Sequence, residues 1–431
     1  MTPQVTFFLN LQNKIMISEI ITIGDELLIG QVVDTNSAWI ATKLNEAGIH
    51  VHQITSVSDT KAHIIEALDN SSKRADLILM TGGLGPTNDD ITKNTLCEYF
   101  NVGLKFDPEA YKDVERIFAM RGRTVTEVNR RQAELPENCV ALHNKNGTAP
   151  GMWFDVNGKI YISMPGVPYE MKGLMENEVI PLLRKKFKLP VIVHRNVLTQ
   201  GIGESDLAGR IADWENSLAR ENIKLAYLPS VGMVRLRLST RGEEASVLEK
   251  KVEKKIEELR NIVGDFIYGY DNDTLESVIG AILKERNQTI STAESCTGGY
   301  ISHLITTIPG SSKYYVGSVI TYSYEIKTLE LNISPDLLNA KGAVSQEVVE
   351  QMAYEVRKKF HTDYSIAVSG IAGPDGGTPE KPVGMVWIAI ATAEGVFSKK
   401  FQFADHRLRN IQYTANAALN MLRKELTGKK K

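Results

Sequence analysis

The chain has 431 residues, with 50 lysines and arginines against 52 aspartates and glutamates and a formal net charge of -2. This length exceeds what one hydrophobic core usually organises, so we expect two or three domains. The near-neutral charge balance gives no global attraction to nucleic acid or to an anionic membrane. Only three cysteines occur, which excludes a disulfide framework and a zinc cluster and favours a reducing, cytoplasmic setting.

Nothing in the chain predicts a membrane segment, because no run approaches the roughly 18 apolar residues that span a bilayer. The opening residues carry a short apolar patch, but no basic region or cleavage site typical of a signal peptide. A second methionine, Met16, directly precedes the first strand-like run. Residues 1–15 are therefore interpreted as an upstream extension or a misplaced start.

Residues 16–188 alternate short β-rich runs with amphipathic stretches, which predicts an α/β domain with βαβ units and a mostly parallel sheet. The expected elements are strand 17–23, helix 36–47, strand 51–57, helix 61–71 and strand 77–80. The first and last of these strands end at glycine-bearing turns. Open α/β sheets bind ligands beyond the carboxyl ends of their strands, so both turns lie where a site is expected.

Residues 189–270 predict a small α+β domain that follows a basic run and Pro190. Its expected elements are strand 191–198, helix 204–213, strands 224–227 and 233–240, and helix 243–262. The segment 268–273 is predicted to be a loop, because its aspartates and asparagine suit a turn before the next helix.

Residues 271–431 predict a second α/β domain. Its expected elements are helix 275–285, strand 289–292, a turn and a short helix, strand 317–322, helix 345–360, strands 364–369, 384–391 and 397–403, and helix 407–424.

The turn after strand 289–292 carries two adjacent nucleophiles, Ser295 and Cys296, within the run Ala-Glu-Ser-Cys-Thr-Gly-Gly. Glycines let a backbone approach a ligand closely, and nearby N–H groups can face a developing oxyanion. A thiol is the better intrinsic nucleophile, yet adjacent side chains leave a strand end in different directions. At most one of the two therefore faces a cleft.

The base for such a nucleophile is predicted to be a lysine or a tyrosine rather than a histidine. The histidines of this domain do not belong to a nucleophile-elbow motif. Lys327 follows Tyr322 and Tyr324 in a segment that we expect to end a strand. A desolvated lysine can have its pKa lowered enough to take a serine proton, so a Ser/Lys/Tyr arrangement is chemically sound.

A glycine- and proline-rich loop follows strand 364–369. Its N–H groups and hydroxyl suit a phosphate or an oxyanion, and the candidates are Ser369, Gly370, Gly373, Gly376 and Gly377. Arg407 and Arg409, at the start of the last helix, could add a phosphate clamp. The alternatives are an ordinary surface loop and a solvated helix face.

These motifs resemble the C-terminal domain of the competence/damage-inducible protein CinA family over about residues 274–425. The resemblance implies deamidation of nicotinamide mononucleotide to nicotinate mononucleotide and ammonia, with no cofactor. Carried over to this chain, it makes Ser295 the nucleophile and Lys327 with Tyr322 or Tyr324 the proton-handling partners. It places the substrate against these residues: Thr297, Gly298, Ser369, the loop glycines, and Arg407 or Arg409. Many relatives carry threonine where Ser369 stands, which keeps the hydroxyl.

A second candidate site follows strand 77–80, in the run Thr-Gly-Gly-Leu-Gly-Pro-Thr-Asn-Asp-Asp. The amides of Gly82, Gly83 and Gly85 after Thr81 can approach a phosphate. Carboxylates that could hold a divalent cation follow two strands: Asp25, Glu26, Asp89 and Asp90. Two acidic turns at one sheet edge suit a phosphate only if a cation compensates their charge. The alternative is that the aspartates cap helices.

This first domain resembles the molybdopterin-binding fold and, more closely, the N-terminal half of the CinA family. The shared runs are Gly-Asp-Glu-Leu-Leu-x-Gly-x-x-x-Asp-x-Asn at residues 24–36 and Met-Pro-Gly-Val-Pro-x-Glu-Met at residues 164–171. The resemblance implies an ADP-ribose pyrophosphatase that uses Mg²⁺, Co²⁺ or Mn²⁺ and releases AMP and ribose 5-phosphate.

The middle segment resembles the KH-like domain of the same family but lacks a clear Gly-x-x-Gly clamp, so nucleic acid is not expected as a partner. The expected partners are small nucleotides and a second copy of the chain in a homodimer. The leading interpretation is thus a bifunctional hydrolase of pyridine-nucleotide turnover. The alternatives are a molybdopterin-binding protein of cofactor biosynthesis and a non-catalytic partner of competence and recombination proteins.

Overall fold

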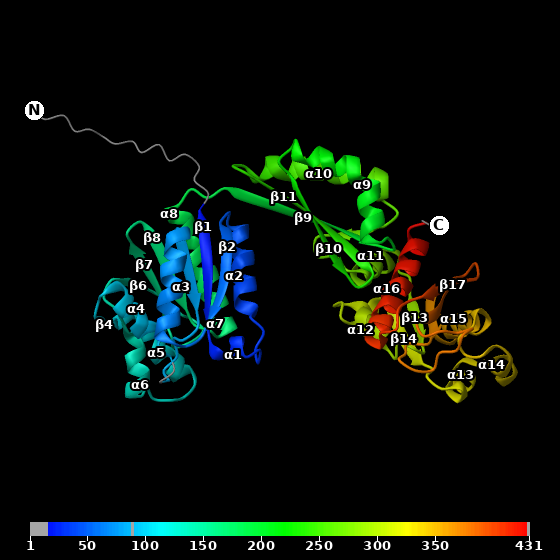
Figure 1. Cartoon of the computed structure of the whole chain (residues 1–431). Coiled ribbons are helices and arrows are strands. Elements are labelled where there is room, and N and C mark those ends of the chain that lie inside the picture. The colour runs from blue at the N-terminus through cyan, green and yellow to red at the C-terminus, as the bar shows by residue number, and fades with distance from the viewer. Residues whose placement is uncertain (1–15, 88–89, 429–431) are drawn as a thin grey trace, which may run out of the picture. The chain divides into compact units, whose positions relative to one another are not determined.

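A computed structural model describes residues 16–87 and 90–428 of the chain (Figure 1). The proposed extension 1–15 and Asp89 lie outside the described residues. The chain divides into two compact units. The first takes in the chain through Val193 with the segment Arg241–Ser246, and the second takes in His194–Thr240 and the chain from Val247.

The first unit is built on a six-stranded sheet of order β2-β1-β3-β8-β7-β6. Its strands are β1 (Ile17–Ile23), β2 (His50–Val57), β3 (Leu77–Thr81), β6 (Cys139–Leu142), β7 (Gly151–Val156) and β8 (Lys159–Met164). Strands β2, β1, β3 and β8 are parallel, whereas β7 pairs antiparallel with β8 and β6 pairs antiparallel with β7. The predicted mostly parallel sheet is confirmed, and its antiparallel edge was not predicted.

Helices connect and cover these strands. They are α1 (Asp25–Leu28), α2 (Thr35–Glu46), α3 (Lys61–Arg74), α4 (Thr92–Phe100), α5 (Pro108–Met120), α6 (Glu127–Arg130), α7 (Pro168–Leu174) and α8 (Ile180–Lys186). A 3₁₀ turn, η1 (Arg131–Ala133), follows α6, and a π-helical turn, η2 (Met175–Val179), joins α7 to α8. Two short strands, β4 (Leu104–Phe106) and β5 (Glu134–Pro136), pair antiparallel.

Apolar cores lie on both faces of this sheet, because successive strand residues point to opposite sides. In β1, Ile20 packs with Ile40 and Leu44 of α2, whereas the next residue, Ile21, packs with Ile64 and other residues of α3. A strand buried on both faces is a continuous hydrophobic run in the sequence, which is why β1 and β3 could be predicted.

The second unit begins with a four-stranded sheet of order β10-β11-β9-β12. Its elements are β9 (Val191–Gln200), α9 (Glu204–Ala219), β10 (Lys224–Ser230), β11 (Met233–Gly242), α10 (Ala245–Val263) and β12 (Ile267–Tyr270). The prediction of a loop at 268–273 was wrong for its first residues. They form β12, which pairs antiparallel with β9, and a pairing so distant in sequence leaves little local signal.

The rest of the second unit has a five-stranded sheet of order β14-β13-β15-β16-β17. Its strands are β13 (Ile290–Glu294), β14 (Tyr315–Ile320), β15 (Tyr364–Gly370), β16 (Met385–Ala391) and β17 (Val396–Gln402). The helices are α11 (Leu275–Arg286), α12 (Tyr300–Thr306), α13 (Tyr324–Leu331), α14 (Pro335–Lys341), α15 (Gln346–Phe360) and α16 (Arg407–Leu426), with a 3₁₀ turn η3 (Ser311–Lys313). Strands β14, β13 and β15 are parallel, β16 pairs antiparallel with β15, and β17 pairs antiparallel with β16.

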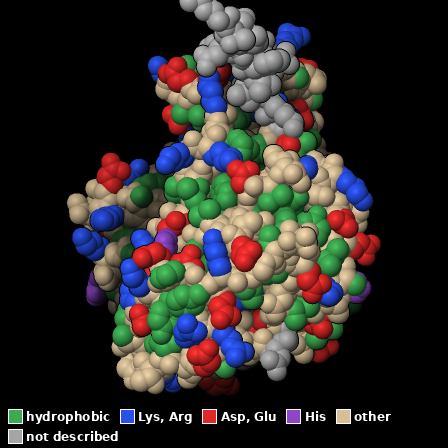
Figure 2. Space-filling view, turned by 90° about the vertical axis from the view of Figure 1, so that its left-hand side faces the viewer, with side chains coloured by type: hydrophobic (Ala, Val, Ile, Leu, Met, Phe, Trp, Pro, Cys, Tyr) green, Lys and Arg blue, Asp and Glu red, His purple; other side chains and the backbone are tan. Residues whose placement is uncertain are grey.

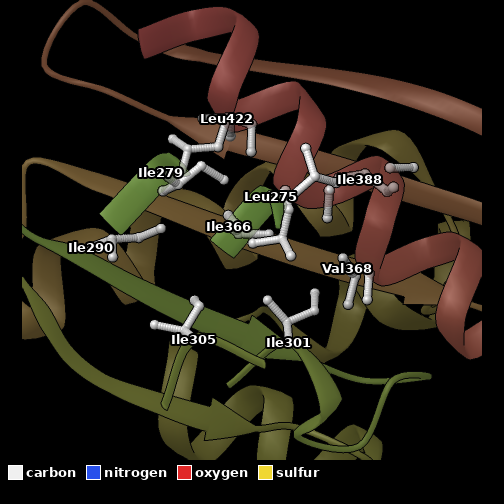
Figure 3. Packing of buried hydrophobic residues seen from close by; sticks show 14 of the residues in the cluster. Leu275, Ile279, Ile290, Ile301, Ile305, Ile366, Val368, Ile388 and Leu422 are labelled. Atoms are coloured by element: carbon white, nitrogen blue, oxygen red, sulfur yellow. The ribbon is translucent and has the colours of Figure 1, made fainter. Parts of the chain in front are cut away.

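This sheet is also covered on both faces. Figure 3 shows Leu275 and Ile279 of α11 and Leu422 of α16 packed with Ile366 and Ile388 of the sheet. A second cluster packs α15 against the other face. Between these two layers, β13 and β15 pair in parallel, so their carboxyl ends lie side by side.

The segment from Tyr322 to Lys327 differs from its prediction. Strand β14 ends at Ile320, and Lys327 lies on a helix, α13, rather than at a strand end. The Ser323 side chain accepts a hydrogen bond from Ile326 N–H at 3.3 Å and so caps this helix.

On the face drawn in Figure 2, basic and acidic side chains are interspersed with hydrophobic ones. Within residues 16–87 and 90–428, none of the helices combines the length and apolar character that crossing a membrane requires.

Arg423 of α16 is buried and ties α16 to the segment before β12. Its guanidinium donates to Ile267 O at 3.2 Å, Asp265 O at 3.4 Å and Asn420 Oδ1 at 2.9 Å. Arg423→Met removes these donors and leaves the acceptors unpaired, two of them in buried hydrogen bonds, Ile267 O and Asn420 Oδ1. We expect the free energy of unfolding of the second unit to fall by about 3 kcal/mol in urea titrations. The exposed Arg237→Met is the control, with an expected change below about 0.5 kcal/mol. Equal free energies of unfolding of the two variants would show that the Arg423 hydrogen bonds do not stabilise the second unit.

Candidate active sites

Ser295 and Lys327 meet at the carboxyl edge of the five-stranded sheet in the second unit. Ser295 follows β13 directly and is 8% exposed, and Lys327, on α13, is 1% exposed. Lys327 Nζ donates to Ser295 Oγ at 3.0 Å and to Thr321 O at 2.5 Å. Burial lowers the pKa of Lys327 from 10.5 to about 8. The pair is therefore a buried serine with an amine that loses its proton at about pH 8 rather than above pH 10.

Cys296 lies in the hydrophobic core, in the cluster that also contains Ile301 and Val368. Burial raises the pKa of its thiol to about 12. A thiol that stays protonated and packs among aliphatic side chains is a poor nucleophile. Of the two candidate nucleophiles, the structure places Ser295 beside the Lys327 amine and Cys296 in the core.

The two tyrosine hydroxyls have other partners than Ser295 and Lys327. Tyr322 is 61% exposed, and its Oη accepts from Arg407 Nη2 at 2.9 Å. Tyr324 Oη accepts from Ala343 N–H at 3.2 Å. The predicted proton-handling tyrosine therefore stays a prediction, with both hydroxyls bound to neighbouring segments.

Ser369 lies near the end of β15, next to the nucleophile's strand in the sheet order. Its Oγ is buried and donates to Ala343 O at 2.7 Å, which leaves the oxygen free to accept. Thr297 Oγ1 is buried too, but it donates to Glu294 Oε2 at 2.7 Å. The Ser369 oxygen therefore keeps an acceptor site, whereas the Thr297 hydroxyl forms a hydrogen bond within its own turn.

Arg407 joins the glycine loop after β15 to the segment between β14 and α13. Arg407 Nη1 donates to Gly373 O at 2.8 Å, while its Nη2 binds the Tyr322 hydroxyl. Gly373 and Gly376 have φ angles of 88° and 90°, and a Cβ at Gly370 would lie 2.5 Å from Val386 Cγ2. These positions require glycine.

The remaining predicted positions of this site, Gly298, Gly377 and Arg409, differ in surroundings. Gly298 has a φ of 61°, and a Cβ there would meet nothing within 4 Å. A Cβ at Gly377 would lie 2.8 Å from Val383 N. Arg409 is exposed on the first turn of α16.

Sequence reasoning missed Glu294 and Thr321. Glu294 is fully buried and accepts hydrogen bonds from the turn after Ser295, and the Thr321 carbonyl anchors Lys327. An acidic residue just before a turn and a helix start is a capping signal that could have drawn attention to Glu294. The contact with Thr321 could not have been found in the sequence, because it uses a backbone carbonyl, which every residue has.

In the first unit, three sequence runs meet at the carboxyl edge of β1 and β3. Thr81 Oγ1 donates to Pro165 O at 2.9 Å. Asn36 Nδ2 donates to Thr81 Oγ1 at 3.2 Å and to Gly166 O at 2.7 Å. A Cβ at Gly82 would lie 2.1 Å from Ile23 O, so glycine is needed for the two strand ends to approach.

Glycines 83 and 85 of the same run also lie against side chains. A Cβ at Gly83 would lie 2.1 Å from Thr92 Oγ1, and one at Gly85 would lie 2.4 Å from Asp90 Oδ2. Asp90 Oδ2 itself accepts from Thr87 N–H at 3.0 Å and from the Thr87 hydroxyl. One oxygen of Asp90 is thus engaged in shaping the loop.

Asp25 and Glu26 begin the short helix α1 and are exposed. Asp25 N–H donates to Asp59 Oδ2 at 3.1 Å, and Asp59 N–H donates to Asp25 Oδ1 at 3.3 Å. Across residues 16–87 and 90–428, three or more metal-ligating side chains do not gather anywhere. The predicted set of Asp25, Glu26 and Asp90 therefore does not by itself fit a divalent cation, and Asp89 is not described.

Comparison with known proteins places these sites in a family. A CinA-like protein from Cytophaga hutchinsonii is 48% identical over 414 residues, which cover 96% of this chain and 99% of the relative. The chain belongs to the CinA family. A CinA-like protein from Flavobacterium psychrophilum is 49% identical over 413 residues, 95% of this chain and 99% of the relative. The predicted family resemblance is confirmed.

Family sequence models match the three parts of the chain in turn. Residues 19–185 match the "Probable molybdopterin binding domain", residues 194–269 the "Damage-inducible protein CinA KH domain" and residues 272–426 the "CinA C-terminal domain". A solved structure of a competence/damage inducible protein from Agrobacterium tumefaciens is 35% identical, covers 36% of this chain and 93% of its own, and has a TM-score of 0.35. The predicted fold, a molybdopterin-binding-like α/β domain, a KH-like middle domain and a CinA C-terminal α/β domain, is confirmed.

Proposed function

We propose that the C-terminal domain of this CinA-family chain hydrolyses a primary carboxamide, with nicotinamide mononucleotide as substrate. The observation that carries the proposal is the 3.0 Å contact between Lys327 Nζ and Ser295 Oγ, both buried. A serine whose partner is an amine with a lowered pKa can act as a nucleophile without a histidine. The substrate follows from the resemblance stated for the sequence, and the geometry supports its chemistry.

The reaction begins with Lys327 as a neutral amine. One of its N–H groups donates to Thr321 O, and its lone pair receives the Ser295 hydroxyl proton as Oγ attacks the carboxamide carbon. The C–N bond then breaks, the nitrogen takes the proton from Lys327, and ammonia leaves. Water hydrolyses the resulting ester of Ser295 to give the nicotinate carboxylate and restore the hydroxyl. One water is consumed for each ammonia released.

The substrate's phosphate is assigned to the glycine loop and the start of α16. Arg409 is exposed there, and Arg407 fixes the loop through Gly373. Arginine forks bind phosphate oxygens in pairs, and loop amides add further donors. Ser369 Oγ, whose hydrogen is already donated, accepts a hydrogen bond from the substrate.

The test is incubation of the full chain with nicotinamide mononucleotide, following ammonia and nicotinate mononucleotide together. Equimolar release of the two products supports the proposal. Without any turnover by the wild-type chain the proposal fails, and a non-catalytic partner of competence and recombination proteins becomes the better interpretation.

We further propose that the N-terminal domain hydrolyses ADP-ribose to AMP and ribose 5-phosphate. The supporting observation is the shared strand edge, where exposed Asp25 and Glu26 follow β1 and the close-approach glycines, Gly82 and Gly83, follow β3. Such an edge is where α/β sheets bind phosphorylated ligands. Dependence on Mg²⁺, Co²⁺ or Mn²⁺ stays a prediction, because the described carboxylates do not form a cation site.

We expect Asp25→Ala to lower AMP release from ADP-ribose by about 100-fold, the scale of loss when a charged group at a reacting centre is removed. The variant removes a carboxylate beside the glycine turn and leaves the second unit untouched. Release is measured with each of the three metals and with a chelator, and ammonia release from nicotinamide mononucleotide is the control. If the wild-type chain releases no AMP with any metal, the pyrophosphatase proposal is wrong and the molybdopterin-binding alternative stands.

A further inference from the structure

Glu294 is a fully buried acidic residue for which the steps above have no role. It is the last residue of β13 and directly precedes Ser295. Burying a carboxylate is costly unless hydrogen-bond donors replace its water. The donors around Glu294 therefore indicate what this turn is built to hold.

Four groups donate to the Glu294 carboxylate. Thr297 Oγ1 donates to Oε2 at 2.7 Å. The N–H groups of Gly299 and Ile301 donate to Oε2 at 3.0 and 3.1 Å, and that of Ser302 donates to Oε1 at 2.8 Å. These N–H groups belong to the start of α12, where intrahelical acceptors are lacking. The Glu294 carboxylate thus accepts the hydrogen bonds of three N–H groups at the start of α12.

This arrangement decides which N–H groups of the turn remain for substrate. The N–H of Ser295 donates to a strand carbonyl, Val368 O, and that of Gly298 donates to Ser295 O, each at 3.1 Å. Over the described part of the chain, the N–H of Thr297 has no acceptor, and the N–H of Cys296 interacts only with its own thiol. They are the two amides that directly follow the nucleophile.

We propose that the N–H groups of Cys296 and Thr297 bind the oxyanion, and that Glu294 is the positioning residue that fixes them. This inference rests on the proposed deamidation. When Ser295 Oγ bonds to the carboxamide carbon, the C=O π electron pair moves onto oxygen, which then carries a negative charge. Donors fixed beforehand at that position cost no reorganisation as the charge develops. Glu294 supplies this rigidity, since it fastens the turn at Thr297 and at the start of α12.

The first test is Glu294→Gln, which keeps the size of the side chain but turns an NH₂ group toward N–H donors. We expect kcat for nicotinamide mononucleotide to fall about 100-fold, the scale of one lost oxyanion donor, with KM changed less than about twofold. The pH midpoint near 8 set by Lys327 stays in place. A purely structural role would lower the yield of folded protein without this split between kcat and KM.

The matched control is Glu19→Gln in the first unit. Glu19 is 1% exposed and accepts from Arg74 Nε at 2.7 Å and from Arg74 Nη2 at 2.9 Å. Glu19→Gln is the same substitution as Glu294→Gln, made at a carboxylate that is equally buried but lies in the first unit. We expect it to leave the deamidation of nicotinamide mononucleotide unchanged.

If Glu294→Gln does not fold, Thr297→Val tests the positioning role of Glu294 instead. This substitution removes the Thr297 hydroxyl, one of the four donors to the Glu294 carboxylate, at nearly constant side-chain volume. We expect about a tenfold lower kcat, a fraction of the full oxyanion effect. Folded variants with wild-type kcat, or a loss confined to KM, overturn the inference and leave the proposed function intact. No ammonia from the wild-type chain overturns both.

Discussion

Replacing Ser295 with alanine is expected to lower kcat for ammonia release from nicotinamide mononucleotide by about 10⁴-fold or more, the scale seen when a covalent nucleophile is removed. The reason is that Ser295 Oγ is the group held 3.0 Å from the Lys327 amine, in a site where both side chains are buried. Substrate contacts elsewhere remain, so the affinity for nicotinamide mononucleotide, measured by calorimetry, is expected to change little.

The matched control for this result is Cys296→Ala. The Cys296 thiol is packed in the core and its pKa is raised to about 12, so its removal leaves kcat within about twofold of wild type. If Cys296→Ala abolishes ammonia release while Ser295→Ala does not, the roles of the two residues are reversed. Ser295→Ala should also leave AMP release from ADP-ribose unchanged, because Asp25 and the glycine turn belong to the other unit.

Replacing Lys327 with methionine is expected to lower kcat/KM by about 10²- to 10⁴-fold, the usual contribution of a general base. Methionine fits the buried stem of the lysine but cannot take a proton. In the proposed reaction only the neutral amine can act as the base, and burial lowers the pKa of Lys327 from 10.5 to about 8. We therefore expect kcat/KM to rise about tenfold per pH unit below about 8 and to level off above it.

The pH profile of the Lys327→Met variant tests whether Lys327 is the general base. The residual activity is expected to lose the rise through pH 8, because the titrating amine is gone. A wild-type profile that is flat between pH 6 and 9, or one that falls as the pH rises, would show that Lys327 is not the base. Lys327→Arg, which keeps a permanent positive charge, should be as inactive as the methionine variant if proton transfer is the role.

Much of the fold could be predicted because its signals are local. Strands β1 and β3 are apolar runs, and glycines follow them at Gly24 and Gly82. The antiparallel strand β12 escaped prediction, since its pairing with β9 joins residues such as Gly269 and Leu198 that lie far apart in the chain. Helix α13 was missed because the Ser323 cap was interpreted as part of a strand end.

In the candidate sites too, features with a local sequence signal could be predicted, and features that depend on distant segments could not. Residue type and glycine spacing pointed to Ser295, Lys327 and Ser369, since nucleophiles, amines and flexible turns are written in the sequence. The choice between Ser295 and Cys296 required the direction of each side chain. The predicted cluster of Asp25, Glu26 and Asp90 depended on distances between loops, and the described carboxylates do not gather.

The sequence by itself determined the family, the order of its domains and the residue types available for hydrolysis, because these depend on composition, periodicity and short runs. Only the tertiary structure decided that α13 places Lys327 against Ser295, 32 positions away, and that burial lowers the pKa of this lysine. It also decided that Glu294 occupies the donors at the start of α12. Desolvation and hydrogen-bond pairing are properties of packed neighbours, and those neighbours exist only once distant segments of the chain come together.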